Sequence, residues 1–225
     1  MTYQRAAAIA RVLTVLSEAD YGRPVRVAID GIVASGKSTI ASEICEAVAL
    51  TGRPAIHLTM DAFHHPRERR HRRGQMSARG YYDDAYDFLG FAREVLIPLG
   101  PDGNRRYRPS LLDLDTNQRV IGPSIEAARD AVVIVDGNFL QRPELRSQWD
   151  LTVFVDTSFD IARARGARRN AIAFGGEMEA GRAIDLRYHA AGHIYVDVVQ
   201  PREIADIVIN NDDFFAPTGP ANNCE

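Results

Sequence analysis

The chain of 225 residues is long enough for one α/β domain with a small lid or insertion, and its hydrophobic content of 45% suffices for a full core. A formal net charge of −3 gives no electrostatic case for a nucleic-acid or membrane partner. The two cysteines provide neither a disulfide framework nor a zinc-binding spacing, and no apolar run could span a bilayer. Because residues 4–17 also lack the pattern of a signal peptide, we expect a cytoplasmic protein.

The first third of the chain predicts a helix, a buried strand and a second helix. Residues 1–22 are expected to form an N-terminal helix, amphipathic over residues 3–19, at the edge of the domain. The apolar, β-branched run at 25–29 predicts the strand, and the Ala-rich segment 39–50 predicts the next helix. Between strand and helix, residues 31–38 read Gly-Ile-Val-Ala-Ser-Gly-Lys-Ser, which fits the phosphate-binding pattern G-x-x-x-x-G-K-[ST].

The spacing of this loop has a physical reason. Gly31 and Gly36 let the backbone turn back on itself, so that successive N–H groups point into one concavity at the positive end of the following helix. Lys37 would reach the β- and γ-phosphates of a nucleoside triphosphate, and the Ser38 hydroxyl would bind Mg²⁺. We therefore expect nucleotide binding by Gly31, Ala34, Ser35, Gly36, Lys37, Ser38 and Thr39. The alternative is a glycine-rich turn without a ligand.

Composition singles out Lys37 a second time. It is the only lysine in the chain, and every other cationic side chain besides histidine is arginine. This bias indicates that arginine serves wherever charge alone suffices. The remaining lysine stands where a compact ammonium on a flexible stem is needed and a planar guanidinium fits badly.

Two aspartates end predicted strands. Residues 55–60 read as a strand that ends in Asp61, and residues 131–135 form a continuous apolar run that ends in Asp136, the Walker B pattern. A carboxylate at the C-terminal end of a strand in a parallel sheet lies on the rim where ligands bind. We expect Asp61 to act in catalysis and Asp136 to hold Mg²⁺ with Ser38. The alternative for both is a turn or helix-cap aspartate.

The middle of the chain is polar. Residues 64–80 carry five arginines between positions 67 and 73, and a solvated loop is favoured over an RNA- or phosphate-contacting patch. Residues 81–87 hold three tyrosines and three aspartates, a set suited to a polyol or nucleoside pocket. Asp83 or Asp84 is expected to cap a helix over residues 85–97. The turn-rich segment 100–123 predicts a hairpin insertion in which residues 105–109 pair with 118–121.

The last part of the chain predicts two further strands and a lid. Residues 151–156 and 206–211 read as strands, and residues 158–170 and 181–199 read as helices. On the first helix Arg165, Arg168 and Arg169 share one face, and a Gly-Gly pair separates it from the second, which carries Arg182 and Arg187. A lid at about 165–185 is therefore one reading, and a solvated arginine face is the other. Residues 212–225 are expected to form a frayed tail.

Taken together, these segments resemble the uridine kinase, phosphoribulokinase and pantothenate kinase group of P-loop kinases, and they are closest to uridine kinase-like proteins. The resemblance covers about residues 24–212. It rests on the segments 29–38, 59–63, 82–87, 135–137, 154–157, 163–169 and 205–211. It implies a single domain with the α/β fold of P-loop NTPases: a doubly wound parallel sheet with helices on both faces, a small hairpin excursion and an arginine-bearing lid.

The resemblance also implies roles for individual residues. ATP with Mg²⁺ would be the phosphoryl donor, and Asp61 would be the catalytic base. Asp84, near Tyr82, would hold ribose hydroxyls, and Tyr107 on the hairpin would stack on a base. The lid arginines would be Arg165, Arg169 and Arg182, of which Arg169 would act in catalysis with Lys37.

We therefore expect an ATP-dependent phosphotransferase that phosphorylates a primary alcohol of a small molecule, with the 5′-hydroxyl of uridine or cytidine favoured. The sequence departs from uridine kinases at Asp136-Gly137, where those enzymes usually have Glu-Gly, and at His64-His65-Pro66, which is more like pantothenate kinases. Pantothenate, a sugar or another small alcohol are the alternative acceptors. A non-catalytic nucleotide-binding regulatory protein is a further alternative. We expect no nucleic-acid or membrane partner, and a homo-oligomer is an option that the sequence leaves open.

Overall fold

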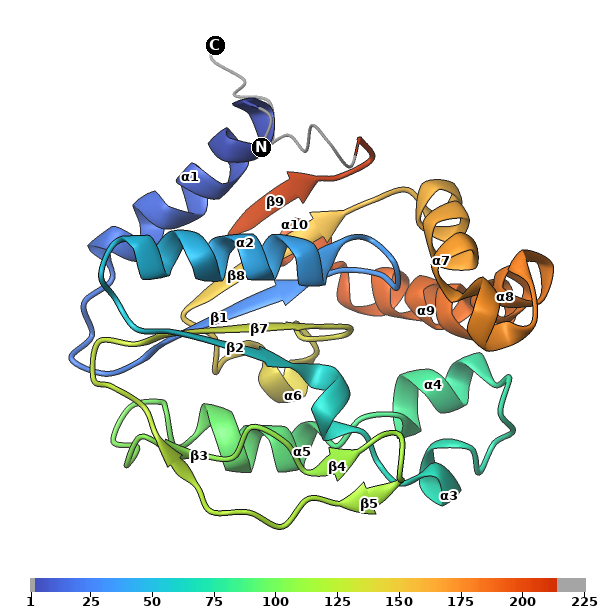
Figure 1. The fold of residues 1–225 in the computed structure, drawn as a ribbon, viewed down its shortest axis with the longest axis horizontal. Helices are drawn as coiled ribbons and strands as arrows, with labels where there is room; N and C mark the ends of the chain where they lie inside the picture. The colour runs from blue at the N-terminus through green and yellow to red at the C-terminus, as the bar shows by residue number, and fades with distance from the viewer. Residues whose placement is uncertain (1–2, 214–225) are drawn as a thin grey trace.

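A central parallel sheet organises the computed structural model, which describes residues 3–213. Its strands lie in the order β2-β7-β1-β8-β9 (Figure 1). Every neighbouring pair is parallel, and β1 lies in the middle between β7 and β8. The strands are β1 (Val25–Asp30), β2 (Ala55–Thr59), β7 (Val132–Gly137), β8 (Leu151–Asp156) and β9 (Ile207–Asn210). Because β1 and β7 are buried along their whole length, their sequences read as continuous apolar runs.

Helices cover both faces of this sheet. On one face lie α1 (Tyr3–Glu18) and α2 (Lys37–Leu50), whose apolar residues pack on β1 and β7. On the other face lie α5 (Phe88–Phe91), a π-helical turn (Ala92–Leu96), α6 (Pro143–Arg146) and α9 (Ala190–Val199), which build a second core (Figure 1). The short α10 (Pro201–Ile204) leads into β9. The predicted doubly wound α/β fold is confirmed.

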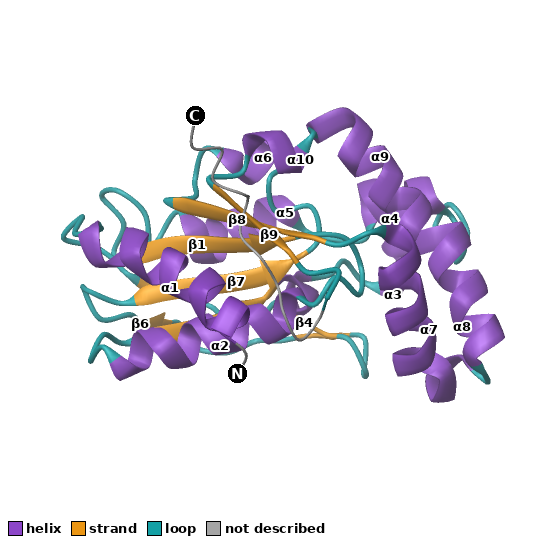
Figure 2. Cartoon of the chain, turned by 90° about the horizontal axis from the view of Figure 1, so that it is seen from above, coloured by secondary structure: helices purple, strands orange, loops and turns teal. Residues whose placement is uncertain are grey.

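The remaining helices lie beyond one end of the sheet (Figure 2). A 3₁₀ turn (Met60–Phe63) follows β2, and α3 (Arg67–Arg70) and α4 (Ala78–Asp84) come next in the chain. Later, α7 (Phe159–Phe174) and α8 (Glu177–Ala183) form a helical hairpin whose turn, Gly175-Gly176, has φ values of +79° and +141°. A π-helical stretch (Ile184–His189) joins α8 to α9. The hairpin occupies the region predicted as a lid, and its closure stays a prediction.

A helical segment does stand in the region 85–97, but it begins at Phe88 as α5 and continues through the π-helical turn to Leu96. The predicted cap at Asp83 or Asp84 is wrong: Asp87 caps this segment and accepts from Gly90 N at 2.9 Å, whereas both aspartates belong to α4, which is capped by Ser77. Residues 85–87 separate α4 from α5 because they pair with the chain after the 3₁₀ turn: His65 N donates to Ala85 O, and Asp87 N donates to Phe63 O.

The predicted hairpin also pairs differently. β3 (Arg106–Tyr107) lies antiparallel to β6 (Ile125–Glu126), and β4 (Leu112–Asp113) lies antiparallel to β5 (Gln118–Arg119). The predicted pairing of 105–109 with 118–121 is therefore wrong. A tight turn is the cause: Asp113 Oδ1 accepts from the backbone N–H groups of Asp115 and Thr116, which folds β5 back onto β4.

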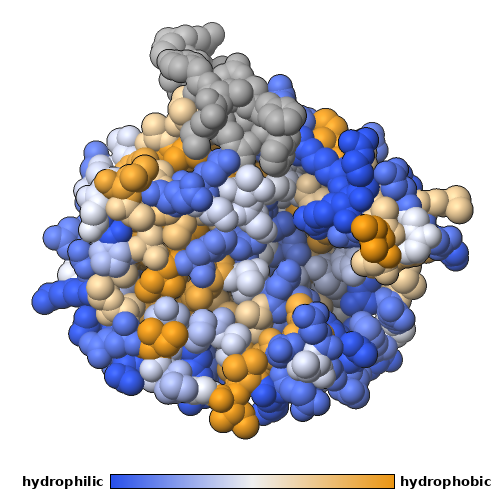
Figure 3. Space-filling model, viewed as in Figure 1, coloured by the Kyte–Doolittle hydropathy of each residue, from blue (hydrophilic) through white to orange (hydrophobic). Residues whose placement is uncertain are grey.

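The surface of the molecule is mixed in polarity. Apolar residues are dispersed among hydrophilic ones on the face seen in Figure 3. None of the helices within residues 3–213 has the length and apolar character needed to cross a membrane. The predicted tail lies, from residue 214 on, outside the described part of the chain.

Candidate active site

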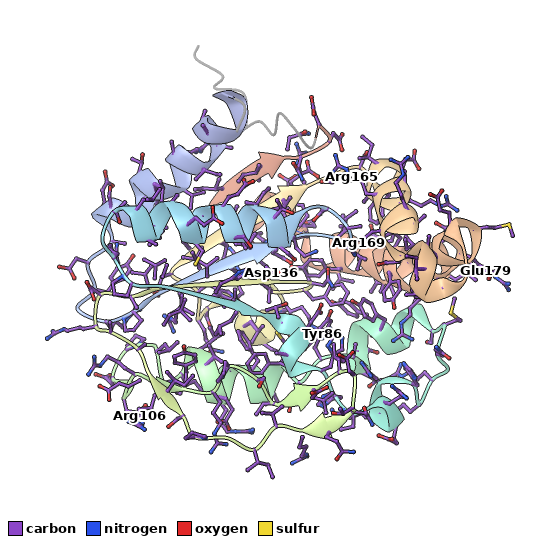
Figure 4. The ribbon with its side chains drawn as sticks, in the orientation of Figure 1. Tyr86, Arg106, Asp136, Arg165, Arg169 and Glu179 are labelled. Atoms are coloured by element: carbon purple, nitrogen blue, oxygen red, sulfur yellow. The ribbon has the colours of Figure 1, made fainter. Side chains whose placement is uncertain are left out.

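A cavity of about 660 Å³ opens where strands β2 and β7 end and where the loop after β1 begins α2. In open parallel sheets this edge is the usual position of a ligand site. The walls come from the phosphate-binding loop, residues 59–76, residues 136–138 and the helices after β8, together with Tyr81 and Leu114. In Figure 4 Asp136, Tyr86 and Arg169 lie in this region, whereas Arg106, the neighbour of Tyr107, lies toward the opposite end of the strands.

The phosphate-binding loop is held in its shape by the protein itself. Ala34 and Gly36 have φ values of +66° and +96°, and a Cβ at Gly31 would lie 2.7 Å from Val155 O, so glycine is required there. Ser35 O accepts from Thr157 Oγ1 at 3.1 Å and from Asn211 Nδ2 at 2.6 Å. These bonds tie the loop to the ends of β8 and β9. Gly31 and Ser35 thus shape the loop without lining the cavity, whereas Ala34, Gly36, Lys37, Ser38 and Thr39 line it.

Lys37 is buried at the start of α2. Its Nζ donates to Ile32 O at 2.7 Å, and only 7% of the residue is exposed. Burial lowers the pKa of the ammonium to about 8, although Asp30, Asp136 and Asp61 act in the opposite direction. A desolvated ammonium facing a cavity interacts strongly with an anion such as a phosphate.

Asp136 sits between two hydrogen-bond donors at the end of β7. Ser38 Oγ donates to its Oδ2 at 2.6 Å, and His57 Nε2 lies 2.9 Å from its Oδ1. Burial raises the pKa of this carboxyl, but the bonds from His57 and Ser38 outweigh it, and the net pKa is lowered. Mg²⁺ is commonly held by one or two protein oxygens together with waters and substrate phosphates. The adjacent oxygens of Ser38 and Asp136 fit that ion.

Asp61, in the 3₁₀ turn after β2, is exposed to the cavity and is held by a chain of hydroxyl groups. Tyr86 donates to Asp61 Oδ1 at 3.2 Å, and the Tyr86 and Tyr81 hydroxyls lie 2.9 Å apart. Asn138 Nδ2 donates to both tyrosines at 3.0 Å. Burial raises the pKa of both tyrosines, so their hydroxyls stay protonated and can donate.

The far wall is rich in arginine, which the sequence reading did not anticipate. Arg67, Arg70 and His71 line the cavity, and Arg187 and Tyr188 face it from the π-helical stretch before α9. Most residues from 67 to 76 are exposed, and Arg72 and Arg73 are offset by neighbouring acids, as expected of a solvated segment; Arg67, Arg70 and His71 in addition line the cavity. The segment is folded against the protein because Arg72 and Arg73 form ion pairs with Asp84.

Several predicted residues lie outside the cavity. Asp84 is buried in its ion pairs with Arg72 and Arg73. Tyr82 lies under the Arg142 guanidinium, 4.2 Å from its ring centroid, and Tyr107 is buried on β3. The predicted pocket of Tyr82, Asp84 and Tyr107 is thus not brought together with Asp61.

The predicted lid arginines also differ in position. Arg169 lines the cavity from α7. Arg165 instead donates to Asn211 O at 2.8 Å and to Asp212 O at 2.7 Å, which ties α7 to the chain after β9, and Arg182 is exposed outside the cavity. Arg187, and not Arg182, lines the cavity. A signal for it exists in the sequence: buried Ala180, Ala183 and Ile184 occupy positions i, i+3 and i+4 of the helical pattern, and Arg187 at i+7 continues their apolar face.

Comparison with known proteins agrees with this architecture. No family model matches the sequence. Over 149 residues, covering 66% of this chain and 69% of the relative, the sequence is 27% identical to a uridine kinase of Alkaliphilus metalliredigens (strain QYMF). Among solved structures, a possible uridine kinase from Bacillus stearothermophilus superposes with a TM-score of 0.71 at 19% identity, covering 90% of this chain and 97% of that one.

A second solved structure is similar to the same degree. A candidate fructose transport system kinase from Silicibacter sp. TM1040 superposes with a TM-score of 0.70 at 24% identity, covering 88% of this chain and 95% of that one. The expected resemblance to the uridine kinase group is thereby confirmed, and the chain has the α/β fold of the P-loop NTPases.

Proposed function

We propose that the protein is an ATP-dependent phosphotransferase that phosphorylates a hydroxyl group of a small molecule. The observation that carries this proposal is the meeting of Lys37, the Ser38–Asp136 pair and Asp61 in one cavity. These are the groups that phosphoryl transfer needs: a phosphate cradle, oxygen ligands for Mg²⁺ and a carboxylate for the acceptor. The similarity to a uridine kinase and the P-loop fold support the same reaction class.

In this proposal the loop holds the donor. Its N–H groups and the Lys37 ammonium bind the β- and γ-phosphates of ATP, and Ser38 with Asp136 binds Mg²⁺. The ion, when bound, neutralises charge on the phosphates. His57 holds the second oxygen of Asp136 and so keeps the carboxylate turned toward Ser38.

Asp61 serves as the base toward the acceptor. Tyr86 holds Asp61 Oδ1, which leaves the other carboxylate oxygen to accept the proton of the acceptor hydroxyl. The hydroxyl oxygen forms a bond to the γ-phosphorus as the bond from the γ-phosphorus to the β–γ bridging oxygen breaks, and ADP leaves. Arg169, on the same side of the cavity as Lys37, counters the charge on the transferring group.

The acceptor is proposed less narrowly than the sequence alone suggested. Uridine or cytidine stays a candidate because of the named relative, but Asp84 and Tyr107, which were expected to select a nucleoside, do not line the cavity. A sugar or another small alcohol is the second candidate, and the hydroxyl and imidazole groups of Tyr81, Tyr188 and His64 on the cavity wall suit such a molecule. Cytoplasmic location, and the absence of nucleic-acid and membrane partners, remain part of the proposal.

The test is coupled ADP release with Mg²⁺–ATP over a panel of acceptors: uridine, cytidine, other nucleosides, simple sugars, pantothenate and phosphorylated or carboxylated polyols. Lys37→Ala provides the blank, and Arg11→Ala, an exposed position on α1, is the matched control. We expect an acceptor-dependent rate in the wild type and in Arg11→Ala that is missing from Lys37→Ala. Tight Mg²⁺–ATP binding without any acceptor-dependent rate would contradict transfer and favour a nucleotide-binding regulatory protein.

A further inference from the structure

The wall of the cavity formed by Arg67, Arg70, His71 and Arg187, here called the arginine wall, carries charge that the protein does not balance. Within residues 3–213 none of the three arginine side chains forms an ion pair with a carboxylate. Elsewhere in the same part of the chain exposed arginines do find carboxylates, for example Arg79 with Asp83 and Arg163 with Asp185. Other exposed arginines in the described part of the chain, such as Arg168 and Arg182, also lack an ion pair, but the arginine wall differs from them because nitrogens of Arg70 and Arg187 are buried without a hydrogen-bond partner.

Arg187 is the most constrained member. Only 6% of the residue is exposed, and its Nε and Nη1 are buried with no hydrogen-bond partner. Its guanidinium is held over two rings, 5.2 Å from the centroid of Tyr81 and 5.6 Å from that of Tyr188. Burying an unpaired guanidinium destabilises a fold, and the planar group is suited to bind an oxyanion through two parallel hydrogen bonds.

The other members are turned toward the same space. Burial lowers the pKa of Arg70, and the charges of Arg67 and Arg187 lower it further. Burial likewise lowers the pKa of His71, with Arg187, Arg70 and Arg67 acting in the same direction. Glu68 acts in the opposite direction on both groups. Four basic groups thus face this one acid around one space, and a bound anion would relieve their repulsion.

The arginine wall lies on the acceptor side of Asp61. The charges that act most strongly on the Lys37 ammonium are those of Asp30, Asp136, Asp61 and Arg169. Arg187 instead packs on Tyr81, whose hydroxyl contacts Tyr86, which in turn donates to Asp61. The charges of Arg70 and Arg187 also act on His64, whose ring contacts Asp61 O at 2.8 Å. These neighbours favour the acceptor, rather than the phosphates of ATP, as the partner of the wall.

We propose that the acceptor alcohol is itself anionic, and that Arg187, with Arg70 and Arg67, binds a phosphate or carboxylate group on it while the hydroxyl to be phosphorylated lies at Asp61. This inference rests on the proposed function and names its substrate class. A nucleic-acid backbone is a poorer match. The flanking Arg72 and Arg73 are already paired with Asp84, and Arg187 is buried inside the cavity rather than displayed on the surface.

The direct test is binding of matched neutral and anionic probes to protein that is saturated with Mg²⁺ and a non-transferable ATP analogue. Isothermal titration would compare glycerol with glycerate and glycerol 3-phosphate, and ribose with ribose 5-phosphate. We expect each anionic probe to bind about 10- to 100-fold tighter than its neutral parent, the gain typical of hydrogen bonds to a charged group. Whichever of phosphate and carboxylate gives the larger gain identifies the group that the acceptor carries.

Two substitutions at Arg187 complete the test. Arg187→Met keeps an apolar stem and should abolish the preference for the anionic probes, and Arg187→Lys should keep part of it. Arg93→Met, at an exposed arginine paired with Glu94, is the matched control and should behave like the wild type. Because Arg187→Met removes a buried unpaired charge, its unliganded form should melt at the same or a higher temperature than the wild type. Equal binding of neutral and anionic probes, or a preference that survives in Arg187→Met, would overturn the proposal.

The same panel separates this inference from the proposed function. ADP release with neutral alcohols that is indifferent to Arg187→Met would leave the phosphotransferase standing and reject the anionic acceptor. An anion preference that disappears in Arg187→Met, with no ADP release from any alcohol, would support the anion site and reject the transfer reaction.

Discussion

The two ends of the cavity differ in how their charges are balanced. At the loop end Lys37 donates to Ile32 O, and Asp136 is held by Ser38 and His57, so each group has a partner within the protein. At the arginine wall Arg187 has buried nitrogens without one. The first end is preorganised by bonds that stay in place, and the second is completed only by a ligand. The difference indicates that the loop end binds the phosphoryl donor and that the arginine wall binds the acceptor.

The two ends also differ in their supports. The loop and Asp136 stand at the ends of adjacent buried strands, β1 and β7, whose register is fixed along their whole length. The arginine wall is carried by the short helix α3 and by a π-helical stretch, more than a hundred residues apart in the chain. Substitutions at each end should therefore change different constants, and the following predictions use this separation.

The largest effect is expected for Asp61→Asn. Loss of the proposed base should lower kcat by about 10²- to 10⁴-fold, the usual contribution of general base catalysis. The affinity for Mg²⁺–ATP should change little, because Asp61 lies beyond the phosphate-binding loop. Steady-state ADP release and nucleotide titration measure the two quantities, and a normal kcat in this variant would exclude Asp61 as the base.

The next largest effect is expected for Lys37→Arg. The substitution keeps the positive charge but places a planar group in a buried space shaped for an ammonium, and we expect a loss of about 10²- to 10³-fold in kcat. Binding of the anionic probes at the arginine wall should persist. An active Lys37→Arg enzyme would contradict the argument that the single lysine of the chain is retained for its shape.

The pH dependence of nucleotide binding tests whether the charge of Lys37 binds the phosphates. The pKa of Lys37 is lowered to about 8 by burial, so the unliganded protein loses this charge as the pH rises through 8. Bound phosphates favour the ammonium form. Affinity for Mg²⁺–ATP should thus be flat below pH 8 and should fall by up to about tenfold per pH unit above it. Titrations from pH 6.5 to 9.5 would show this fall in the wild type but not in Lys37→Arg, and a flat wild-type profile would contradict it.

Tyr86→Phe tests the hydroxyl chain at the boundary between the two ends. Removing the donor to Asp61 should lower kcat by about tenfold, equivalent to about 1.4 kcal/mol, and leave the KM for ATP unchanged. In an Asp61→Asn background the same substitution should add little, because the two residues act as one unit. Equal effects of Tyr86→Phe in both backgrounds would mean that the tyrosine acts on packing alone.

Asp150→Asn should leave both ends of the cavity intact while it lowers the stability of the fold. Asp150 directly precedes β8, at the end of the sheet opposite the cavity, where its carboxylate accepts hydrogen bonds from Arg23 and Arg26. Burial alone would raise the pKa of Asp150, but these hydrogen bonds outweigh it and lower the pKa to about 2. A depressed pKa contributes stability that is present above about pH 4 and is lost as the pH falls toward 2, here about 2 kcal/mol.

Denaturant unfolding at pH 7 and at low pH measures this contribution. The variant should be less stable at pH 7, the difference should shrink as the pH falls, and kcat should equal that of the wild type. A fall in kcat would mean that general destabilisation accounts for losses elsewhere.

The loop end was predictable from the sequence because its information is local. The pattern at residues 31–38 predicts the loop, the buried strand β7 is a continuous apolar run that leads into Asp136, and the strand before Asp61 is recognisable as well. Their convergence follows from the parallel sheet alone. The structure adds His57 and Asn138, whose neighbours depend on strand order and side-chain direction.

The arginine wall was not predictable in the same way because its contacts are long-range. The Asp84 carboxylate could accept hydrogen bonds from sugar hydroxyls, but it is occupied by ion pairs with Arg72 and Arg73. Tyr107 pairs with a strand at 125–126 rather than with 118–121, and this places it away from Asp61. Arg187 shows the one usable signal, a charged residue on the apolar face of its helix, since a buried charge without a partner points to a ligand.

The most direct measurement of the account is a cross-titration of three proteins: the wild type, Lys37→Arg and Arg187→Met. Each is titrated with Mg²⁺ and the ATP analogue, and then, with the analogue saturating, with glycerol 3-phosphate. We expect Lys37→Arg to lose affinity for the nucleotide and to keep its affinity for glycerol 3-phosphate. We expect Arg187→Met to keep its affinity for the nucleotide and to lose affinity for glycerol 3-phosphate. If both substitutions weaken both ligands alike, the cavity does not have two separate ends, and the central claim is wrong.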